Sequence, residues 1–311
     1  ATTIVPAVNA AIADVVMGVG DFRDFPVPDY GDPGDWPFAL RQAMTSDTAA
    51  VQAALNSLRA GGGNDGPEAQ IEGLFRSVSG TCAAGGGGFG EACFRPMSHP
   101  IIVVVTDNQT HNGPGGANPY SGVSPTPATY SGTIAALTGQ NVKIIGCAVD
   151  PSLPGFPFPF PSEATDHLEA IARDTGSTAS AGGLTVYPAV GGAVSTAIVD
   201  GIADLVGATT QDINSQTRDD ASDAVDATLF IKAVRPLRAT RATRFDDTTF
   251  YGVVSGTTVT FEVRFENDFL PHQPYVQIFQ AFIDVLDIAS GTVVDSRNVY
   301  IVVPAEDGFL I

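Results

Sequence analysis

Two short apolar runs constrain the fold of this chain more than any other feature. Residues 101–105 read Ile-Ile-Val-Val-Val, and residues 142–149 are apolar almost throughout. Strands of a parallel sheet are buried on both faces, so they carry continuous apolar runs rather than alternating ones. A Gly/Pro-rich stretch and a short helix, expected around residues 129–137, separate the two runs. The spacing predicts two buried strands of a parallel sheet, with residues 101–105 as a central strand.

Further helices and strands alternate with these two over residues 1–207. Apolar side chains at helical spacing predict helices near residues 4–15, 51–58, 71–78, 168–172 and 194–205, and short strands are expected over residues 15–22 and 36–44. Pro67 is expected in the first turn of the helix that contains Ile71, where proline is well tolerated. The alternation predicts an α/β domain, residues 1–210, with a doubly wound and mostly parallel sheet.

A different pattern begins near residue 210. Residues 211–226 are polar and acidic, and we expect them to form a linker that is solvated rather than calcium-binding. Four later segments have strand character, namely residues 228–234, 257–265, 277–286 and 292–303. Residues 227–311 are therefore predicted to form a small all-β sandwich.

The charge balance excludes several classes of partner. The chain has 34 acidic and 15 basic residues, which give a formal net charge of -19. Such a chain would repel nucleic-acid phosphates and anionic lipid surfaces. No apolar run approaches the roughly 20 residues that a membrane helix needs, so no membrane span is expected. The low content of charged residues, 16%, suits an exported or acid-tolerant protein.

The three cysteines are expected to have different fates. Cys82 and Cys93 flank a Gly-rich stretch, and a disulfide between them would stabilise that loop. Cys147 falls in the apolar run of residues 142–149, so we expect a buried free thiol.

Acidic residues stand where the predicted elements begin and end. Asp24 follows the strand of residues 15–22, Asp65 and Glu68 precede a helix, and Asp107 follows the strand of residues 101–105. Ligand sites of α/β folds lie at the carboxyl ends of parallel strands, where these acids can converge. Hard divalent cations take oxygen ligands of this kind. The sequence therefore predicts a metal site that leaves one position for an incoming acidic ligand.

At these residues the chain resembles the von Willebrand factor A superfamily, and specifically the I-like domain of integrin β subunits. Residues 22–30, the Asp-Gly-Pro-Glu turn of residues 65–68, and Thr106-Asp107 are similar to three stretches of that domain in order and in spacing. The resemblance covers about residues 1–207, and the β domain that follows is similar to the hybrid or Ig-like domain that adjoins the I-like domain.

The resemblance implies roles for individual residues. Glu68 and Asp107 would belong to a primary Mg2+ site, the metal-ion-dependent adhesion site. Asp24, Asp65, the Pro67 carbonyl and Glu68 would belong to an adjacent Ca2+ site.

One part of the family pattern is missing. The Asp-x-Ser-x-Ser motif that ends the first strand of the family has no counterpart; Asp150-Pro151-Ser152 is only a partial echo after a later strand. We expect a sheet that lacks its first, central strand, so that another segment supplies it or the chain begins within the first helix.

Plainer interpretations of the same residues remain open. Asp65 alone fits a helix N-cap, Asp107 fits a loop cap, and Asp24 fits a surface ion pair. His111, in the loop after Asp107, is expected to be a solvated loop residue rather than a group that contacts a ligand or a carboxylate.

Three functions are consistent with these observations. The first is an extracellular adhesion module that binds a protein ligand through an acidic side chain and a divalent cation, Mg2+ with Ca2+ beside it. The alternative is a structural subunit of a surface filament that self-associates by strand donation between subunits. A metal-assisted hydrolase is the third. No nucleophile elbow, phosphate-binding loop or zinc-protease helix is present in the sequence, so we expect no enzymatic activity.

Overall fold

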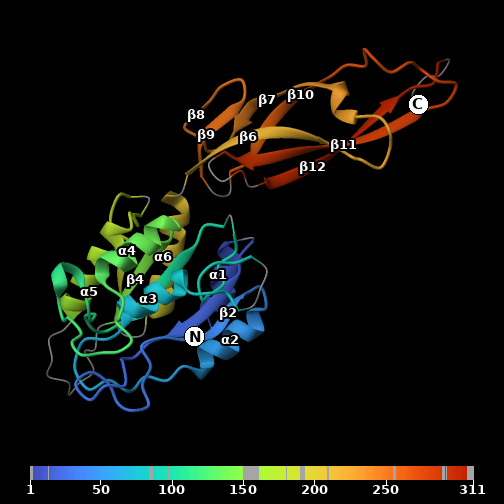
Figure 1. Ribbon diagram of the computed structural model, residues 1–311. Coiled ribbons are helices and arrows are strands. Elements are labelled where there is room, and N and C mark those ends of the chain that lie inside the picture. Colours follow the sequence, from blue (N-terminus) through green and yellow to red (C-terminus); the bar gives the residue numbers. More distant parts are fainter. Residues whose placement is uncertain are drawn as a thin grey trace. The chain divides into compact units, whose positions relative to one another are not determined.

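The chain divides into two compact units, Ala1–Ala208 and Thr209–Ile311. The computed structural model describes residues 3–12, 14–83, 87–96, 98–149, 161–179, 181–189, 193–208, 210–254, 257–288, 291 and 293–306. Figure 1 shows helices and strands mixed in the first unit and strands predominating in the second. The partial serine motif at residues 150–152 lies outside the described residues.

A parallel sheet lies at the centre of the first unit. Its strands are β3 (Ile101–Thr106), β4 (Lys143–Val149) and β5 (Val186–Ala189), in the order β3-β4-β5. Successive side chains of β4 face opposite sides, because strand side chains alternate. Ile144 contributes to one core cluster, and Ile145 and Cys147 to another.

Helices cover both faces of this sheet. Helices α3 (Gln70–Ser79), α4 (Tyr130–Gly139) and α5 (Pro161–Asp174) pack on the Ile144 side. Helices α1 (Ile4–Ala11) and α6 (Val194–Ala208) pack on the Ile145 side. The first unit is therefore a mixed α/β structure with three layers, consistent with the predicted alternation.

The first two strands form a separate hairpin. Strands β1 (Met17–Asp21) and β2 (Ala39–Thr45) pair with each other in antiparallel fashion. Val19 of the hairpin packs with Val5 of α1 and Val51 of α2 (Thr48–Ser57), and Asp47 caps α2. Among the described strands, none pairs with the free edge of β1.

The predicted central position of residues 101–105 is wrong for the described strands. β3 is an end strand of the three-stranded sheet, and Val105 is 39% exposed. β4 takes the middle position instead, with Ile144 and Ile145 fully buried. A β-branched apolar run favours a strand, but it carries no information about the partners at the two edges of that strand.

The expected helical position of Pro67 is also wrong. Helix α3 begins at Gln70 with Ala69 as its N-cap residue, so Pro67 and Glu68 lie in the preceding loop and Asp65 is not the cap. The backbone of Glu68 instead pairs with a second loop: its N–H donates to the Gln109 carbonyl at 3.0 Å, and its carbonyl accepts from the His111 N–H at 2.8 Å. These bonds hold residue 68 in an extended conformation.

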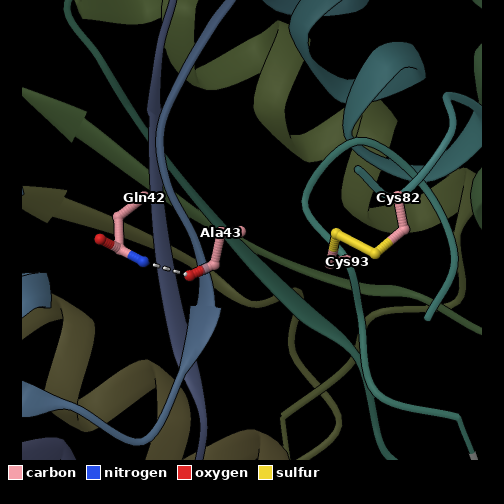
Figure 2. Close-up of a disulfide and its surroundings, with 4 residues drawn as sticks. All are labelled: Gln42, Ala43, Cys82 and Cys93. Carbon is pink, nitrogen blue, oxygen red and sulfur yellow. Dashed lines mark hydrogen bonds between the residues drawn. A yellow bond between two sulfur atoms is a disulfide. The ribbon is translucent and has the colours of Figure 1, made fainter. Parts of the chain in front are cut away.

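The cysteine predictions are confirmed. Cys82 and Cys93 form a disulfide with a sequence separation of 11, and Cys147 is buried and free. Figure 2 shows the disulfide in one view with Gln42 and Ala43 of β2. The neighbouring Ala92 carbonyl accepts a hydrogen bond from the Met44 N–H at 2.9 Å, which attaches the bridged loop to β2.

The second unit contains two sheets. The five-stranded sheet has the order β12-β11-β6-β9-β8, and the smaller sheet pairs β10 with β7. Their bounds are β6 (Thr210–Asp219), β7 (Ile231–Ala239), β8 (Arg244–Phe245), β9 (Thr249–Val254), β10 (Val259–Phe265), β11 (Gln277–Asp287) and β12 (Val293–Val303). A short 3-10 helix, η3 (Ala227–Phe230), precedes β7. The two sheets share a core in which Phe250 of β9 contacts Phe261 of β10.

The predicted acidic linker, residues 211–226, is wrong over its first part. These residues begin within β6, which pairs with both β11 and β9. Ile213 is the only residue of β6 that is fully buried, and Arg218 forms an ion pair with Asp284. Because the strand buries so little apolar surface, its composition resembles that of a solvated segment. Asp226 caps η3 through the Thr228 N–H, as expected for an acid in a turn.

Candidate metal centre

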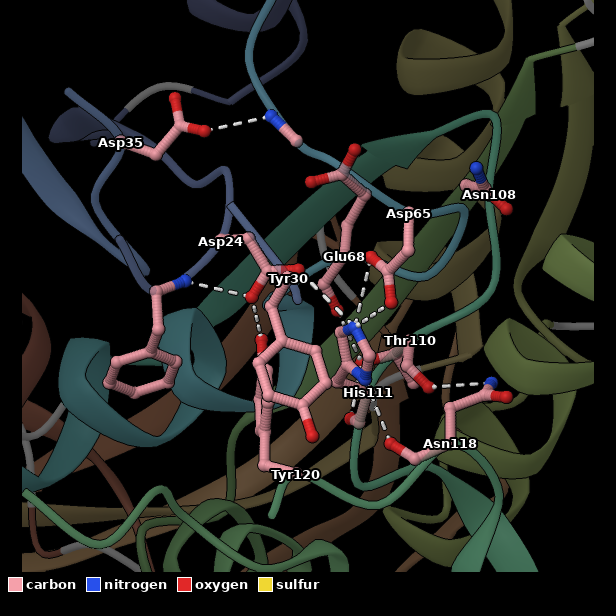
Figure 3. A network of polar contacts seen from close by, with 12 residues as sticks. Asp24, Tyr30, Asp35, Asp65, Glu68, Asn108, Thr110, His111, Asn118 and Tyr120 are labelled. Carbon is pink, nitrogen blue, oxygen red and sulfur yellow. Dashed lines mark hydrogen bonds and ion pairs between the residues drawn. The ribbon is translucent and has the colours of Figure 1, made fainter. Parts of the chain in front are cut away.

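Backbone hydrogen bonds bring three distant segments of the first unit together. The Ala69 N–H donates to the Arg23 carbonyl at 2.9 Å, and the Glu68 bonds described above add the loop that contains Gln109 and His111. A residue after β1, the loop before α3 and the loop after β3 therefore lie side by side. This arrangement positions Asp24, Asp65 and His111 around one point (Figure 3).

Asp24 is the most deeply buried member of this group and has no exposed surface. Its Oδ1 accepts hydrogen bonds from the Phe25 N–H at 2.8 Å and from the Tyr120 hydroxyl. Burial and the Asp24 carboxylate both raise the pKa of the Tyr120 phenol, which keeps that group a donor. Asp24 Oδ2 lies 3.3 Å from Nε2 of His111, an ion-pair distance, yet it is buried without a hydrogen bond.

His111 faces the carboxylates with Nε2. Its Nδ1 lies 2.9 Å from the Asn118 carbonyl, so Nδ1 carries the proton of that bond. Nε2 lies 3.1 Å from Oδ2 of Asp65. The ring stacks on Tyr120 at a centroid distance of 4.2 Å and meets Tyr30 edge-on at 5.1 Å. These contacts fix the orientation of the imidazole.

The prediction that His111 is a solvated loop residue is wrong. Only 3% of the residue is exposed, because the two tyrosine rings and the residue 68 loop cover it. Burial lowers the pKa of His111, but the Asp24 carboxylate, the Asn118 carbonyl and the charge of Asp65 outweigh that effect and raise it overall. The open alternative, contact with a carboxylate, is the one observed.

The other predicted site residues take different positions around this group. Asp65 lies at the outer side, with 32% of its side chain exposed. Burial is the largest of the causes that raise its pKa, and His111 opposes them. The Glu68 carboxylate is directed at Gly63, where a Cβ atom would lie 3.2 Å from Oε1. Asp107 is exposed at the end of β3, and among the contacts of the described residues none places the Pro67 carbonyl at the group.

The charges of the other acidic side chains nevertheless act on the Glu68 carboxyl group. Burial raises the pKa of Glu68 to about 8, assisted by the charges of Asp24, Asp107, Asp65 and Asp35. The four predicted acidic side chains are therefore close enough to interact electrostatically. Asp24 and Asp65 form a compact group with His111, and Glu68 and Asp107 lie outside it. Their roles as metal ligands remain predictions.

A separate ion pair supports the loop before α3. Asp35 accepts hydrogen bonds from the Asp32 and Gly63 N–H groups, each at 2.8 Å, and from Arg23 at 3.1 Å. Gly62 has a φ of 94°, and a Cβ atom there would lie 2.1 Å from Asp35, so this turn requires glycine. Arg23 is thus paired with Asp35, and the ion pair expected as an alternative for Asp24 is made by His111 instead.

The donor atoms of the compact group are suitable for a cation. One atom from each of Asp24, Asp65 and His111 lies within 4.8 Å of the others. The buried Asp24 Oδ2 has no hydrogen bond and only the 3.3 Å contact with His111 Nε2, so a bound ion would satisfy it. Sequence reasoning missed His111 and Tyr120 as part of this group. The available signal was the spacing of His111, four residues after Asp107 at the same strand end.

Comparisons with known proteins find likenesses among solved structures. No protein-family model and no curated protein matches the chain. Among solved structures, the chain is similar to a von Willebrand factor type A protein from Catenulispora acidiphila, with 13% sequence identity and a TM-score of 0.35. The match covers 98% of this chain and 62% of that chain, so this chain spans less than two thirds of its neighbour.

Proposed function

We propose that the chain is a protein-binding module of the von Willebrand factor A type, which binds its partner through a divalent cation. The observation that carries the proposal is the convergence of Asp24, Asp65 and His111 on one point, with a buried carboxylate oxygen left without a hydrogen bond. The order of the acidic motifs along the chain supports the same family. The second unit, with its two sheets that share a core, suits an Ig-like or hybrid-like β-sandwich.

The geometry of the site suits recognition of an acidic partner. Asp24 closes the group on the protein side, and Asp65 is its most exposed member. A cation held there would keep a coordination position on the Asp65 side, where a partner carboxylate can enter. The overall charge of -19 would otherwise repel an acidic partner, so the cation is needed for attraction.

The proposed Mg2+ site uses Glu68 and Asp107, and the adjacent site uses Asp24, Asp65, the Pro67 carbonyl and Glu68. Calorimetric titration of the chelator-treated chain with Mg2+ and with Ca2+ tests both. The heats should be lost or strongly reduced in Glu68→Ala and in Asp107→Ala, and Glu262→Ala, a change at an exposed glutamate of the second unit, should bind as the parent does. Unchanged heats in both site variants would discard this metal assignment.

A peptide-binding measurement tests the recognition step. A pool of aspartate-containing peptides should bind the immobilised chain in Mg2+ and dissociate when a chelator is added. A matched pool with asparagine in place of aspartate should not bind. The disulfide favours an extracellular or cell-surface location for such a module. No catalytic step is part of the proposal, and turnover of an ester or phosphate would contradict it.

The split sheet favours a second candidate, a structural subunit that assembles by strand donation. Among the described strands, none pairs with the outer edge of β3, where Val105 is 39% exposed. Unpaired strand edges accept further strands. This candidate predicts concentration-dependent polymers in the presence of a chelator, measured by sedimentation velocity. A chain that stays monomeric under those conditions would rule it out.

A further inference from the structure

We propose that Asp24, Asp65 and His111 form a zinc site, with Asp24 Oδ2, an Asp65 carboxylate oxygen and His111 Nε2 as ligands. The inference rests on the proposed cation-dependent function and replaces Ca2+ by Zn2+ at the adjacent site. Three protein ligands with an open fourth position are typical of zinc sites that exchange a water or an external ligand.

The nitrogen ligand decides between classes of metal. Ca2+ and Mg2+ take oxygen ligands, whereas imidazole nitrogen together with carboxylates suits zinc and its neighbours in the first transition row. His111 Nε2 is the atom that faces both carboxylates, at 3.3 Å from Asp24 and 3.1 Å from Asp65. A tetrahedral ion with bonds of about 2.0–2.2 Å separates its ligand atoms by roughly 3.3–3.6 Å. The two nitrogen–oxygen separations are close to these values, and the ligand oxygens of Asp24 and Asp65 lie within 4.8 Å of each other.

The surrounding residues hold two of the ligands as metal sites generally do. A ligating histidine usually donates its second ring N–H to a carbonyl or carboxylate, and its carboxylate neighbours are themselves hydrogen-bonded. Here His111 Nδ1 donates to the Asn118 carbonyl at 2.9 Å. The Tyr120 hydroxyl and the Phe25 N–H bind Asp24 Oδ1, which leaves Oδ2 directed at the site.

A proton on Nε2 is the competing occupant of this position. An imidazolium would donate a hydrogen bond to Asp65, with which Nε2 has contacts of 3.1 and 3.3 Å. Asp24 Oδ2, in a fully buried residue, would then have only the 3.3 Å ion-pair contact with Nε2 and no hydrogen bond of good geometry. A metal ion between the three atoms satisfies all of them at once. The geometry therefore favours Zn2+ over the proton.

The test compares metals and variants on the whole, untagged chain. After chelator treatment, the chain is titrated with Zn2+, Mg2+ and Ca2+ by calorimetry. Zn2+ should bind with one equivalent per chain and more tightly than Ca2+, and His111→Gln should weaken Zn2+ binding by at least about tenfold. His272→Gln, the same change at an exposed histidine of the second unit, should leave Zn2+ binding unchanged.

NMR of the imidazole nitrogens gives a second measurement on the unaltered chain. It tests whether Zn2+ binds His111 Nε2 even if the His111 variant fails to fold. Addition of Zn2+ should remove the proton from His111 Nε2 and shift that nitrogen, while Nδ1 keeps its proton. Retention of the Nε2 proton, or equal Zn2+ affinity in both histidine variants, would overturn the zinc assignment. If Ca2+ binds and His111→Gln does not weaken it, the zinc inference fails and the proposed function stands. If no divalent cation binds, both fail.

Discussion

Glu68 shows how strongly burial and neighbouring charges act on a single carboxyl group of the first unit. Burial and four neighbouring carboxylates raise the pKa of Glu68 to about 8. Its ionised form is therefore disfavoured in the folded, metal-free chain. The unfolded chain restores an ordinary pKa near 4.5. Glu68 thus contributes stability that is fully present below about pH 4.5 and is lost as the pH rises through about 8.

Replacement of Glu68 by glutamine should reverse this loss. Glutamine keeps the shape of the protonated side chain and cannot ionise, so Glu68→Gln should stabilise the metal-free chain by more than about 1 kcal/mol at alkaline pH. Below pH 4.5 the variant should have no advantage. Urea unfolding at several pH values, with Glu262→Gln as the control, measures the difference. A stability gain of equal size at acid and alkaline pH would contradict the electrostatic explanation.

The Tyr120 hydroxyl should contribute more to the stability of the folded chain than the Tyr30 hydroxyl, although both rings contact His111. Tyr120 donates to the buried Asp24 Oδ1, whereas the Tyr30 hydroxyl accepts an exposed hydrogen bond from the Ser121 N–H. Loss of a bond to a buried charged group costs about 1–3 kcal/mol, and loss of an exposed bond costs less. Tyr120→Phe should therefore lower the free energy of unfolding more than Tyr30→Phe. Equal losses in urea unfolding would show that Asp24 does not depend on this donor.

The proximity of Asp24 and Asp65 could be predicted from sequence, and that of His111 could not. The rule that acids at strand ends and before a helix meet at the rim of a sheet gave Asp24, Asp65, Glu68 and Asp107, of which Glu68 and Asp107 lie outside the compact group. The burial of His111 depends on Tyr30, from the connection between β1 and β2, and on Tyr120, from farther along the same β3–α4 connection as His111. Loop-to-loop packing has no periodic signature in sequence.

At the scale of elements, the position of a strand in its sheet determines how much its side chains contribute to the free energy of unfolding. Val142, the residue immediately before β4, is fully buried, whereas Val105 of β3 is 39% exposed. Val142→Ala should lower the free energy of unfolding by about 2 kcal/mol, and Val105→Ala by less than about 1 kcal/mol. Chemical unfolding of the two variants measures both values. Equal losses would mean that a further strand covers β3 in solution.

The disulfide should stabilise the loop before β3. Closure of a loop of this length restricts the unfolded chain and is worth about 3 kcal/mol. Reductant should therefore lower the unfolding midpoint of the parent chain. The Cys82→Ser/Cys93→Ser variant should show the lower midpoint with and without reductant, and Cys147 should react with thiol reagents only on unfolding because it is buried. A parent midpoint that reductant leaves unchanged would contradict this role.

The periodicity of apolar residues predicted most helices and strands. It failed where backbone hydrogen bonds, rather than apolar burial, determine the structure. The strand-like and helix-like apolar patterns of β4, α2 and α6 match the structure because burial of their apolar face decides them. Apolar periodicity does not predict strand β6, because pairing with β11 and β9 rather than apolar burial stabilises this strand. The start of α3 was misplaced because the backbone of Glu68 pairs with the loop after β3 instead of entering the helix.

At the scale of the whole molecule, the two units have separate hydrophobic cores. The clusters around Ile144 and Ile145 contain residues of the first unit, and those around Phe230 and Phe250 contain residues of the second. The cation-binding group lies entirely in the first unit. Residues that share one hydrophobic core unfold together. Each unit should therefore unfold in a cooperative transition of its own.

Scanning calorimetry should therefore resolve two transitions, and only one should respond to metal. A ligand that binds the folded state alone stabilises it by about 2.7 kcal/mol at a hundred times its dissociation constant. Added divalent cation should raise the melting temperature of the first unit and leave that of the second unchanged. His111→Gln should remove the shift that Zn2+ causes, while His272→Gln should keep it. A single transition, or equal shifts in both, would show that the units are coupled or that the ion binds elsewhere.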